Sequence, residues 1–103
     1  MGKRDKIKEL TNILAIALRH KIGATVNSNE IYAGKYARDA DVLIREAEKV
    51  NFGENWNSSD KDMIKRELKK KLILELEKRD FIDNKKFNFV DSEIELVLDR
   101  LLI

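Results

Sequence analysis

The side chains that could carry catalysis or bind a metal ion are few in this sequence. His20 is the only histidine, and the chain has no cysteine. A Ser-His-Asp triad would need His20, but no nucleophile-elbow motif accompanies it. A zinc site would need carboxylates from elsewhere, because neither H-x-x-x-H nor E-x-x-H spacing occurs. We therefore interpret His20 as a boundary residue near the C-terminus of a helix, and we predict no catalytic and no metal-binding residue.

Acidic residues often stand two positions apart, as in Asp39/Asp41, Glu46/Glu48, Asp60/Asp62, Glu75/Glu77 and Glu93/Glu95. Two positions correspond to about 200° around a helix, so the members of a pair point in different directions. Such pairs are poor metal ligands and poor acid–base partners, and we interpret them as solvated faces. The phosphate-binding patterns G-x-x-x-x-G-K and G-x-G-x-x-G do not occur. We therefore predict no cofactor and no enzymatic activity.

Basic residues are concentrated in one stretch of the chain. Residues 57–71 contain six lysine and arginine residues and three acids, a net charge of +3, whereas residues 91–103 contain one arginine and four acids, a net charge of −3. Four cations fall along one side of the predicted helix, named here the basic side: Lys65, Arg66, Lys69 and Lys70. Neighbouring cations can follow a phosphate backbone. The alternative interpretation is a solvated face, or a match to the acidic last helix.

The spacing of apolar residues predicts helices over about 5–21, 29–50, 59–79 and 91–102. The expected caps are Gly23 after the first helix, Asn27 with Glu30 before the second, Asn57, Ser58 or Ser59 before the third, and Asp91 before the fourth. In the second helix a ridge of small residues favours close packing against another helix: Ala33, Ala37, Ala40, Ile44 and Ala47. The third helix repeats an apolar residue every four positions: Ile64, Leu68, Leu72 and Leu76.

Residues 80–90 are rich in phenylalanine and contain a short alternating segment, so they predict either a short β-ribbon or an aromatic loop packed on the helices. Together the elements predict an all-α, compact four-helix bundle-like fold, with residues 1–103 as a single helical domain.

One segment resembles a known family. Residues 72–90, with L-E-L-E-K-R-D-F-I-D followed by K-K-F-N-F-V, look like the passage from a winged-helix recognition helix into its wing. The segment covers about a fifth of the chain. The predicted third helix is longer than such recognition helices usually are, and we assign no family. The resemblance implies a nucleic-acid-binding protein that uses the basic side.

Composition narrows the function further. The chain has 103 residues, of which 43% are hydrophobic and 39% charged, with a net charge of +2. No apolar run is long enough to span a membrane and no signal peptide is visible, so we expect a cytoplasmic protein without membrane contact. By elimination we expect a non-enzymatic interaction module whose partner is another protein or a second copy of itself. Nucleic-acid binding is the alternative, and an enzyme with a pocket that the sequence does not reveal is the third hypothesis.

Overall fold

The computed structural model describes residues 2–28 and 31–103, which form four α-helices and one short 3₁₀ helix. The elements are α1 (Lys3–Val26), α2 (Ala33–Asn51), α3 (Ser58–Glu77), η1 (Asn84–Phe89) and α4 (Val90–Arg100). The described part of the chain contains no β-strand. The all-α, bundle-like fold predicted from the sequence is confirmed.

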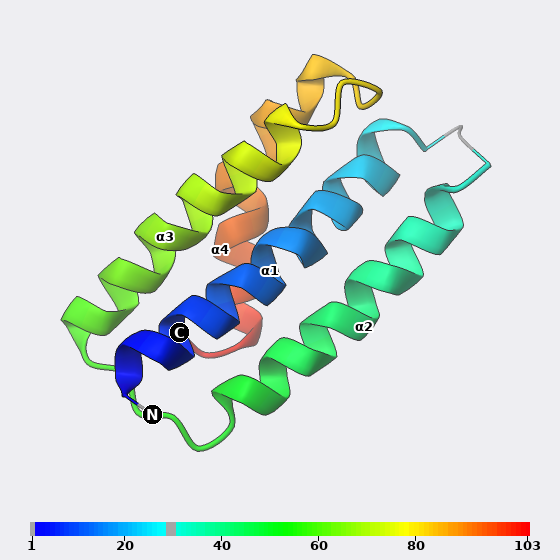
Figure 1. Cartoon of the computed structure of the whole chain (residues 1–103). Coiled ribbons are helices and arrows are strands. Elements are labelled where there is room, and N and C mark those ends of the chain that lie inside the picture. Colours follow the sequence, from blue (N-terminus) through cyan, green and yellow to red (C-terminus); the bar gives the residue numbers. More distant parts are fainter. Residues whose placement is uncertain (1, 29–30) are drawn as a thin grey trace.

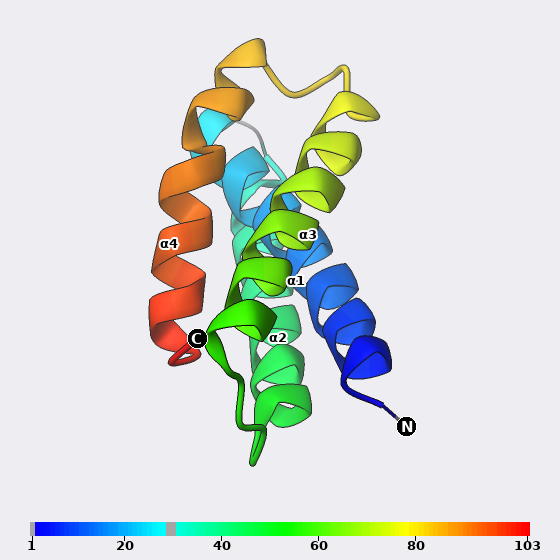
Figure 2. The same cartoon turned by 90° about the vertical axis from the view of Figure 1, so that its left-hand side faces the viewer.

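The four helices surround a common core and follow the long axis of a molecule that measures 40 × 21 × 21 Å. In Figure 1, α1 lies between α2 and α3, and α4 lies behind them. In the turned view of Figure 2, α4 lies beside α3, away from the start of α1 but close to its end. Helices α1 and α3 run in the same direction, and α2 and α4 run in the opposite one. In the described chain α2 packs along α1 but not against α3, so the connection between α2 and α3 crosses one end of the bundle.

The core forms where the apolar stripes of α1 and α3 meet. The predicted stripe of α3 is confirmed, since all four of its members are fully buried: Ile64, Leu68, Leu72 and Leu76. Leu10, Leu14 and Leu18 are equally buried on α1. Burying one such side chain contributes about 1.5–3 kcal/mol relative to leaving it in water. These two stripes therefore supply a large part of the stability.

The small-residue ridge of α2 packs against α1 over only part of its length. Ala40, Ile44 and Ala47 are buried, as predicted, whereas Ala33 is half-buried and Ala37 is exposed. The small side chains allow the two helices to approach closely. Helix α2 is therefore held mainly through its second half.

The expected caps between α1 and α2 are wrong. Helix α1 continues through Gly23 to Val26, and Gly23 is buried inside it. Asn27 ends α1, since its backbone N–H donates to the Gly23 carbonyl at 2.9 Å and its side-chain amide donates to the Phe81 carbonyl at 3.2 Å. Asn27 thus serves the helix before it rather than the helix after it. Glu30, its expected capping partner, lies outside the described residues, and α2 begins at Ala33 instead of residue 29.

Residues 80–90 form neither a β-ribbon nor the wing implied by the winged-helix resemblance. The chain turns at Asp83, whose side chain accepts a hydrogen bond from the Lys85 N–H, and continues as η1 directly into α4. Phe89, not Asp91, precedes α4. The loop is anchored by Ile82 and by the buried Lys86, which donates to the Arg79 carbonyl at 2.7 Å. Of the two predicted alternatives, the segment therefore corresponds to the loop packed on the helices, since Ile82 lies against Gly23 of α1 and Phe89 packs against the core.

Candidate binding surfaces

The structure divides the basic side into two pairs of residues. Lys65 and Lys69 point toward α4 and form ion pairs with Glu95 and Asp91, the second at 3.0 Å. The Glu95 carboxylate raises the pKa of Lys65 because it stabilises the ammonium. Arg66 and Lys70 are exposed. The match to the acidic last helix, one of the two interpretations of the sequence, therefore accounts for half of the basic side.

Several of the paired acids also hold helices together, which corrects their interpretation as solvated faces. The Glu93 carboxylate lies 2.7 Å from Lys21 Nζ and is only 12% exposed. Asp60 pairs with Lys3 at 2.8 Å, and Glu48 pairs with Arg100 at 2.9 Å. Glu93 and Glu95 point in different directions, since Glu93 pairs with Lys21 of α1 and Glu95 with Lys65 of α3. The sequence pattern missed these contacts because the partners lie on other helices.

A second group of cations lies in a groove of about 600 Å³ between the first halves of α1 and α3, named here the α1–α3 groove. Its charged lining consists of Arg4, Asp5, Lys8, Arg66, Glu67 and Lys71. Only Arg66 belongs to the predicted basic side. Arg4 and Lys8 come from the other helix, so no pattern within the third helix could have indicated them.

Lys71 reaches into this groove and is held by a buried hydroxyl. Its Nζ donates to Thr11 Oγ1 at 2.6 Å, and the Thr11 hydroxyl donates to the Ile7 carbonyl at 2.7 Å. Burial lowers the pKa of Lys71; the charge of Lys8 lowers it further, and Glu67 opposes this. The ammonium is thus partly withdrawn from water and lies close to the opposing charges of Glu67 and Lys8.

Aromatic side chains gather at the end of the molecule where α1 ends and α2 begins. Tyr32 is 60% exposed and Phe81 62% exposed. With Asn27 and Tyr36 they line a hollow of about 380 Å³. A second hollow of about 280 Å³ shares two of these residues and is lined by Arg19, His20, Gly23, Tyr36, Arg79, Phe81 and Ile82. We name the two adjoining hollows the aromatic end.

His20 belongs to this surface and not to a helix terminus as predicted. Helix α1 continues to Val26, and His20 Nδ1 lies 2.8 Å from the Ile16 carbonyl, so that this nitrogen donates to it. The His20 ring meets Tyr36 edge to face, with centroids 5.7 Å apart. The histidine therefore forms a wall of the hollow together with Tyr36.

Two arginines give the aromatic end a positive charge. Burial lowers the pKa of Arg19 and the nearby Arg79 lowers it further, while Glu75 opposes both. The Glu75 carboxylate is 3.9 Å from the Arg19 guanidinium, a long distance for an ion pair. No carboxylate of the described residues lines either hollow.

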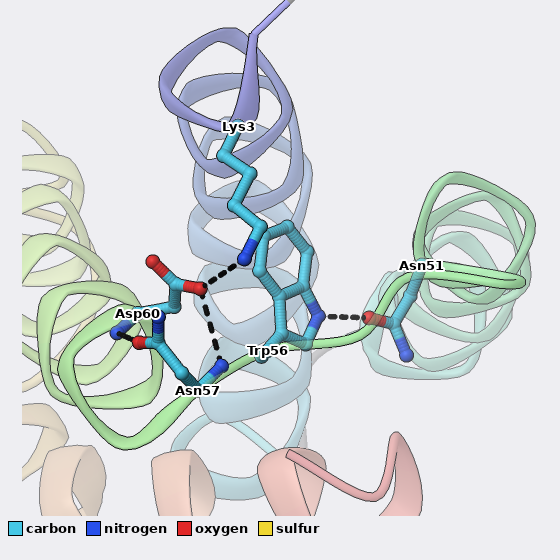
Figure 3. Close-up of polar contacts among 5 residues, drawn as sticks. All are labelled: Lys3, Asn51, Trp56, Asn57 and Asp60. Carbon is cyan, nitrogen blue, oxygen red and sulfur yellow. Dashed lines mark hydrogen bonds and ion pairs between the residues drawn. The ribbon is translucent and has the colours of Figure 1, made fainter.

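The opposite end of the bundle is closed by Trp56, as Figure 3 shows. Trp56 lies in the connection between α2 and α3, is 8% exposed, and donates from Nε1 to Asn51 Oδ1 at 2.6 Å. The Asn51 amide in turn donates to the Leu101 carbonyl at 2.9 Å. Beside it, Asn57 and Asp60 form a capping box. These contacts fasten the crossing connection, and we assign this end a structural role.

The described residues contain neither a cluster of metal-ligating side chains nor a membrane-spanning helix. Within residues 2–28 and 31–103, no three His, Cys, Asp or Glu side chains gather as a metal site would require. None of the described helices combines the length and apolar character needed to cross a bilayer. The chain matches no model of a known protein family, no curated protein and no solved structure.

Proposed function

We propose that this protein is a non-enzymatic helical module that binds a segment of another protein at the aromatic end. The observation that carries the proposal is that Tyr32 and Phe81, from distant parts of the sequence, lie exposed around the same hollow. Exposed aromatic residues around a concavity are typical anchors of protein interfaces. Apolar residues elsewhere on the helices give weaker support. Val42 and Leu96 are exposed on separate helices, Ile16 is only marginally exposed, and Ile73 packs against the core.

Charge favours a different protein over a second copy of this chain as the partner. A twofold contact between two copies would bring identical surfaces together. Arg19 and Arg79 of one copy would then face those of the other, and none of the described residues that line this hollow carries a carboxylate. Like charges placed opposite each other across an interface are unfavourable. The partner segment should therefore carry a carboxylate beside an apolar side chain.

Short synthetic peptides test this proposal. We expect peptides that combine Asp or Glu with Leu or Phe to bind, and their counterparts with Lys or Arg not to bind. Phe81→Ala should weaken binding at least about tenfold, because truncating a central aromatic anchor costs about 2 kcal/mol or more. The matched control is Phe52→Ala, since Phe52 is 88% exposed and directly follows α2, whose first turn lies at the aromatic end.

The readout is fluorescence anisotropy of labelled peptides, with sedimentation velocity to measure self-association. Equal binding of acidic and basic peptides would contradict the proposal, as would equal effects of the two phenylalanine substitutions. A stable dimer that Phe81→Ala dissociates would show that the second copy is the partner after all.

Nucleic-acid binding through the basic side ranks second as a function. The ion pairs of Lys65 and Lys69 with α4 leave Arg66 and Lys70 as the free cations of that side. Two exposed cations supply little of the electrostatic free energy on which binding to a phosphate backbone depends. Retention of the protein on duplex DNA or RNA that decreases steeply as the salt concentration rises would favour this alternative.

A further inference from the structure

The α1–α3 groove brings together cations that are distant in the sequence. Because α1 and α3 are parallel neighbours, Arg4 and Lys8 on one helix face Arg66 and Lys71 on the other across the same groove. None of the four forms an ion pair with another residue of the described chain. Lys65 and Lys69, on the same helix, are paired. The lining has four cations and two acids, so the groove carries a net positive charge.

Lys71 differs from a solvated surface lysine because its ammonium is held in a fixed position. Its ammonium is fixed by the buried Thr11 hydroxyl, with a donor–acceptor distance of 2.6 Å. Partial withdrawal from water disfavours the ammonium and lowers the pKa of Lys71, and the charge of Glu67 in the same groove offsets only part of this effect. An anion in the groove would stabilise the ammonium further.

The dimensions of the groove fit a strand with repeated phosphates better than one small anion. Lys8 follows Arg4 by four positions and Lys71 follows Arg66 by five, which corresponds to about 6 Å and about 7.5 Å along a helix. One strand of a duplex carries a phosphate about every 3.4 Å of its axis, so the groove spans about two phosphates. The described residues that line the groove include no aromatic side chain on which a base could stack.

We propose that the α1–α3 groove binds the phosphate backbone of a nucleic acid without reading its sequence, through Arg4, Lys8, Arg66 and Lys71. This site is separate from the aromatic end and does not depend on its function. It replaces the basic side as the surface that would contact phosphate, and it retains only Arg66 from that prediction.

The test measures binding to a labelled duplex of about 20 base pairs by fluorescence anisotropy, between about 0.05 and 0.2 M salt. We expect the logarithm of the affinity to fall with the logarithm of the salt concentration with a slope of about −2 to −3. The groove variant is Lys8→Glu with Arg66→Glu, two exposed positions where the fold should persist. It should weaken binding at least about tenfold and reduce the slope by about 2.

The matched control is Arg38→Glu with Lys49→Glu, which makes the same change in net charge on exposed positions of α2. We expect it to change the affinity less than about threefold, because long-range charge effects are screened by salt. Circular dichroism melts confirm that both variants fold. Equal losses in the two variants would overturn the proposal, because net charge alone would then explain the binding.

Three further outcomes would also overturn it. The first is a parent protein that does not bind the duplex at the lowest salt concentration. The second is displacement of the duplex by inorganic phosphate at low millimolar concentration, which would indicate a site for one small anion. The third is loss of binding in the variant Lys65→Glu with Lys69→Glu but not in the groove variant. That result would show that the duplex binds the basic side and not the groove.

Discussion

Leu102 adopts a left-handed backbone conformation, with φ of +61°, and its side chain is 88% exposed. Its N–H donates to the Asp99 carbonyl, and the N–H of Ile103 donates to the Leu98 carbonyl at 2.9 Å. This hydrogen-bond pattern closes α4 as a Schellman motif, in which glycine is the usual residue at the left-handed position. The left-handed conformation is sterically unfavourable for leucine, and the exposed side chain gains little from packing in return.

We predict that Leu102→Gly stabilises the protein by about 0.5–1 kcal/mol. The left-handed conformation costs about 1–2 kcal/mol for a residue with a Cβ atom, and the greater freedom of unfolded glycine cancels part of the gain. Urea denaturation measures the change. Leu102→Ala is the control, since it removes the leucine side chain but keeps the Cβ atom and should change the stability little.

Asp60 combines three interactions in its carboxylate and backbone. Its carboxylate accepts hydrogen bonds from Lys3 Nζ and from the backbone N–H of Asn57, and its own N–H donates to the Asn57 side chain (Figure 3). The hydrogen bond from Lys3, followed by that from Asn57, lowers the pKa of Asp60. A carboxylate with a lowered pKa stabilises the fold above its unfolded pKa, and this contribution disappears as the pH falls through the folded pKa.

We therefore expect the Asp60 contribution to be lost in acid, below the ordinary pKa of an aspartate. Urea denaturation from about pH 6 to about pH 2.5 should show a smaller loss of stability for Asp60→Asn than for the parent protein. The asparagine oxygen can still accept the hydrogen bond from Asn57 but carries no charge. Identical pH profiles for the two proteins would contradict this assignment.

At the scale of the elements, α2 depends on one narrow stripe. Ala40, Ile44 and Ala47 are its buried residues, and in the described chain its extended packing is against α1 alone. A small residue in such a contact sets the distance between two helices. The stability of α2 in the bundle should therefore be sensitive to residue size on this face and insensitive to it on the outer face.

We predict that Ala40→Leu destabilises the protein by about 1–3 kcal/mol, because the added atoms overpack the contact with α1. Val42→Leu is the control on the same helix, since Val42 is 58% exposed, and it should change little. Thermal melts of both variants measure the difference. Two neutral substitutions would mean that α2 does not pack on α1 through this face.

At the scale of the whole molecule, charge ties α4 to each of the other helices. Lys65 and Lys69 connect it to α3, while Lys21 connects it to α1. Arg100 of α4 pairs with Asp41 and Glu48 of α2. Exposed ion pairs contribute little individually and are weakened by salt, but several of them here act on one short helix.

We predict that Lys65→Glu with Lys69→Glu leaves the fold intact. The double substitution should, however, reverse the direction in which added salt changes the melting temperature. In the parent protein, added salt screens the attraction between α3 and α4 and lowers the melting temperature. In the variant, salt screens the repulsion from Glu95 and Asp91 and raises it. Melts at about 0.05 and about 0.5 M sodium chloride measure both slopes. The same slope in both proteins would show that these pairs do not contribute.

The sequence by itself determined the parts of this protein that depend on neighbouring residues. The apolar repeat of α3 and the cap at Asn57 are set by helical periodicity and by hydrogen bonds over three residues, and both are found in the structure. The end of α1 was predicted wrongly because the signal at Gly23 is also local, whereas the position is decided by contact. A Cβ atom at Gly23 would lie 3.4 Å from Ile82, which comes from the loop after α3.

Only the tertiary structure decided which surfaces face one another. The connection between α2 and α3, which contains Trp56, crosses the end of the bundle and places α3 parallel to α1. That crossing brings Arg4 and Lys8 to Arg66 and Lys71, while α4 takes Lys65 and Lys69 away from the basic side. No periodicity within one helix encodes these contacts, because they depend on the order in which the helices pack. For this reason the core could be predicted from the sequence and the candidate sites could not.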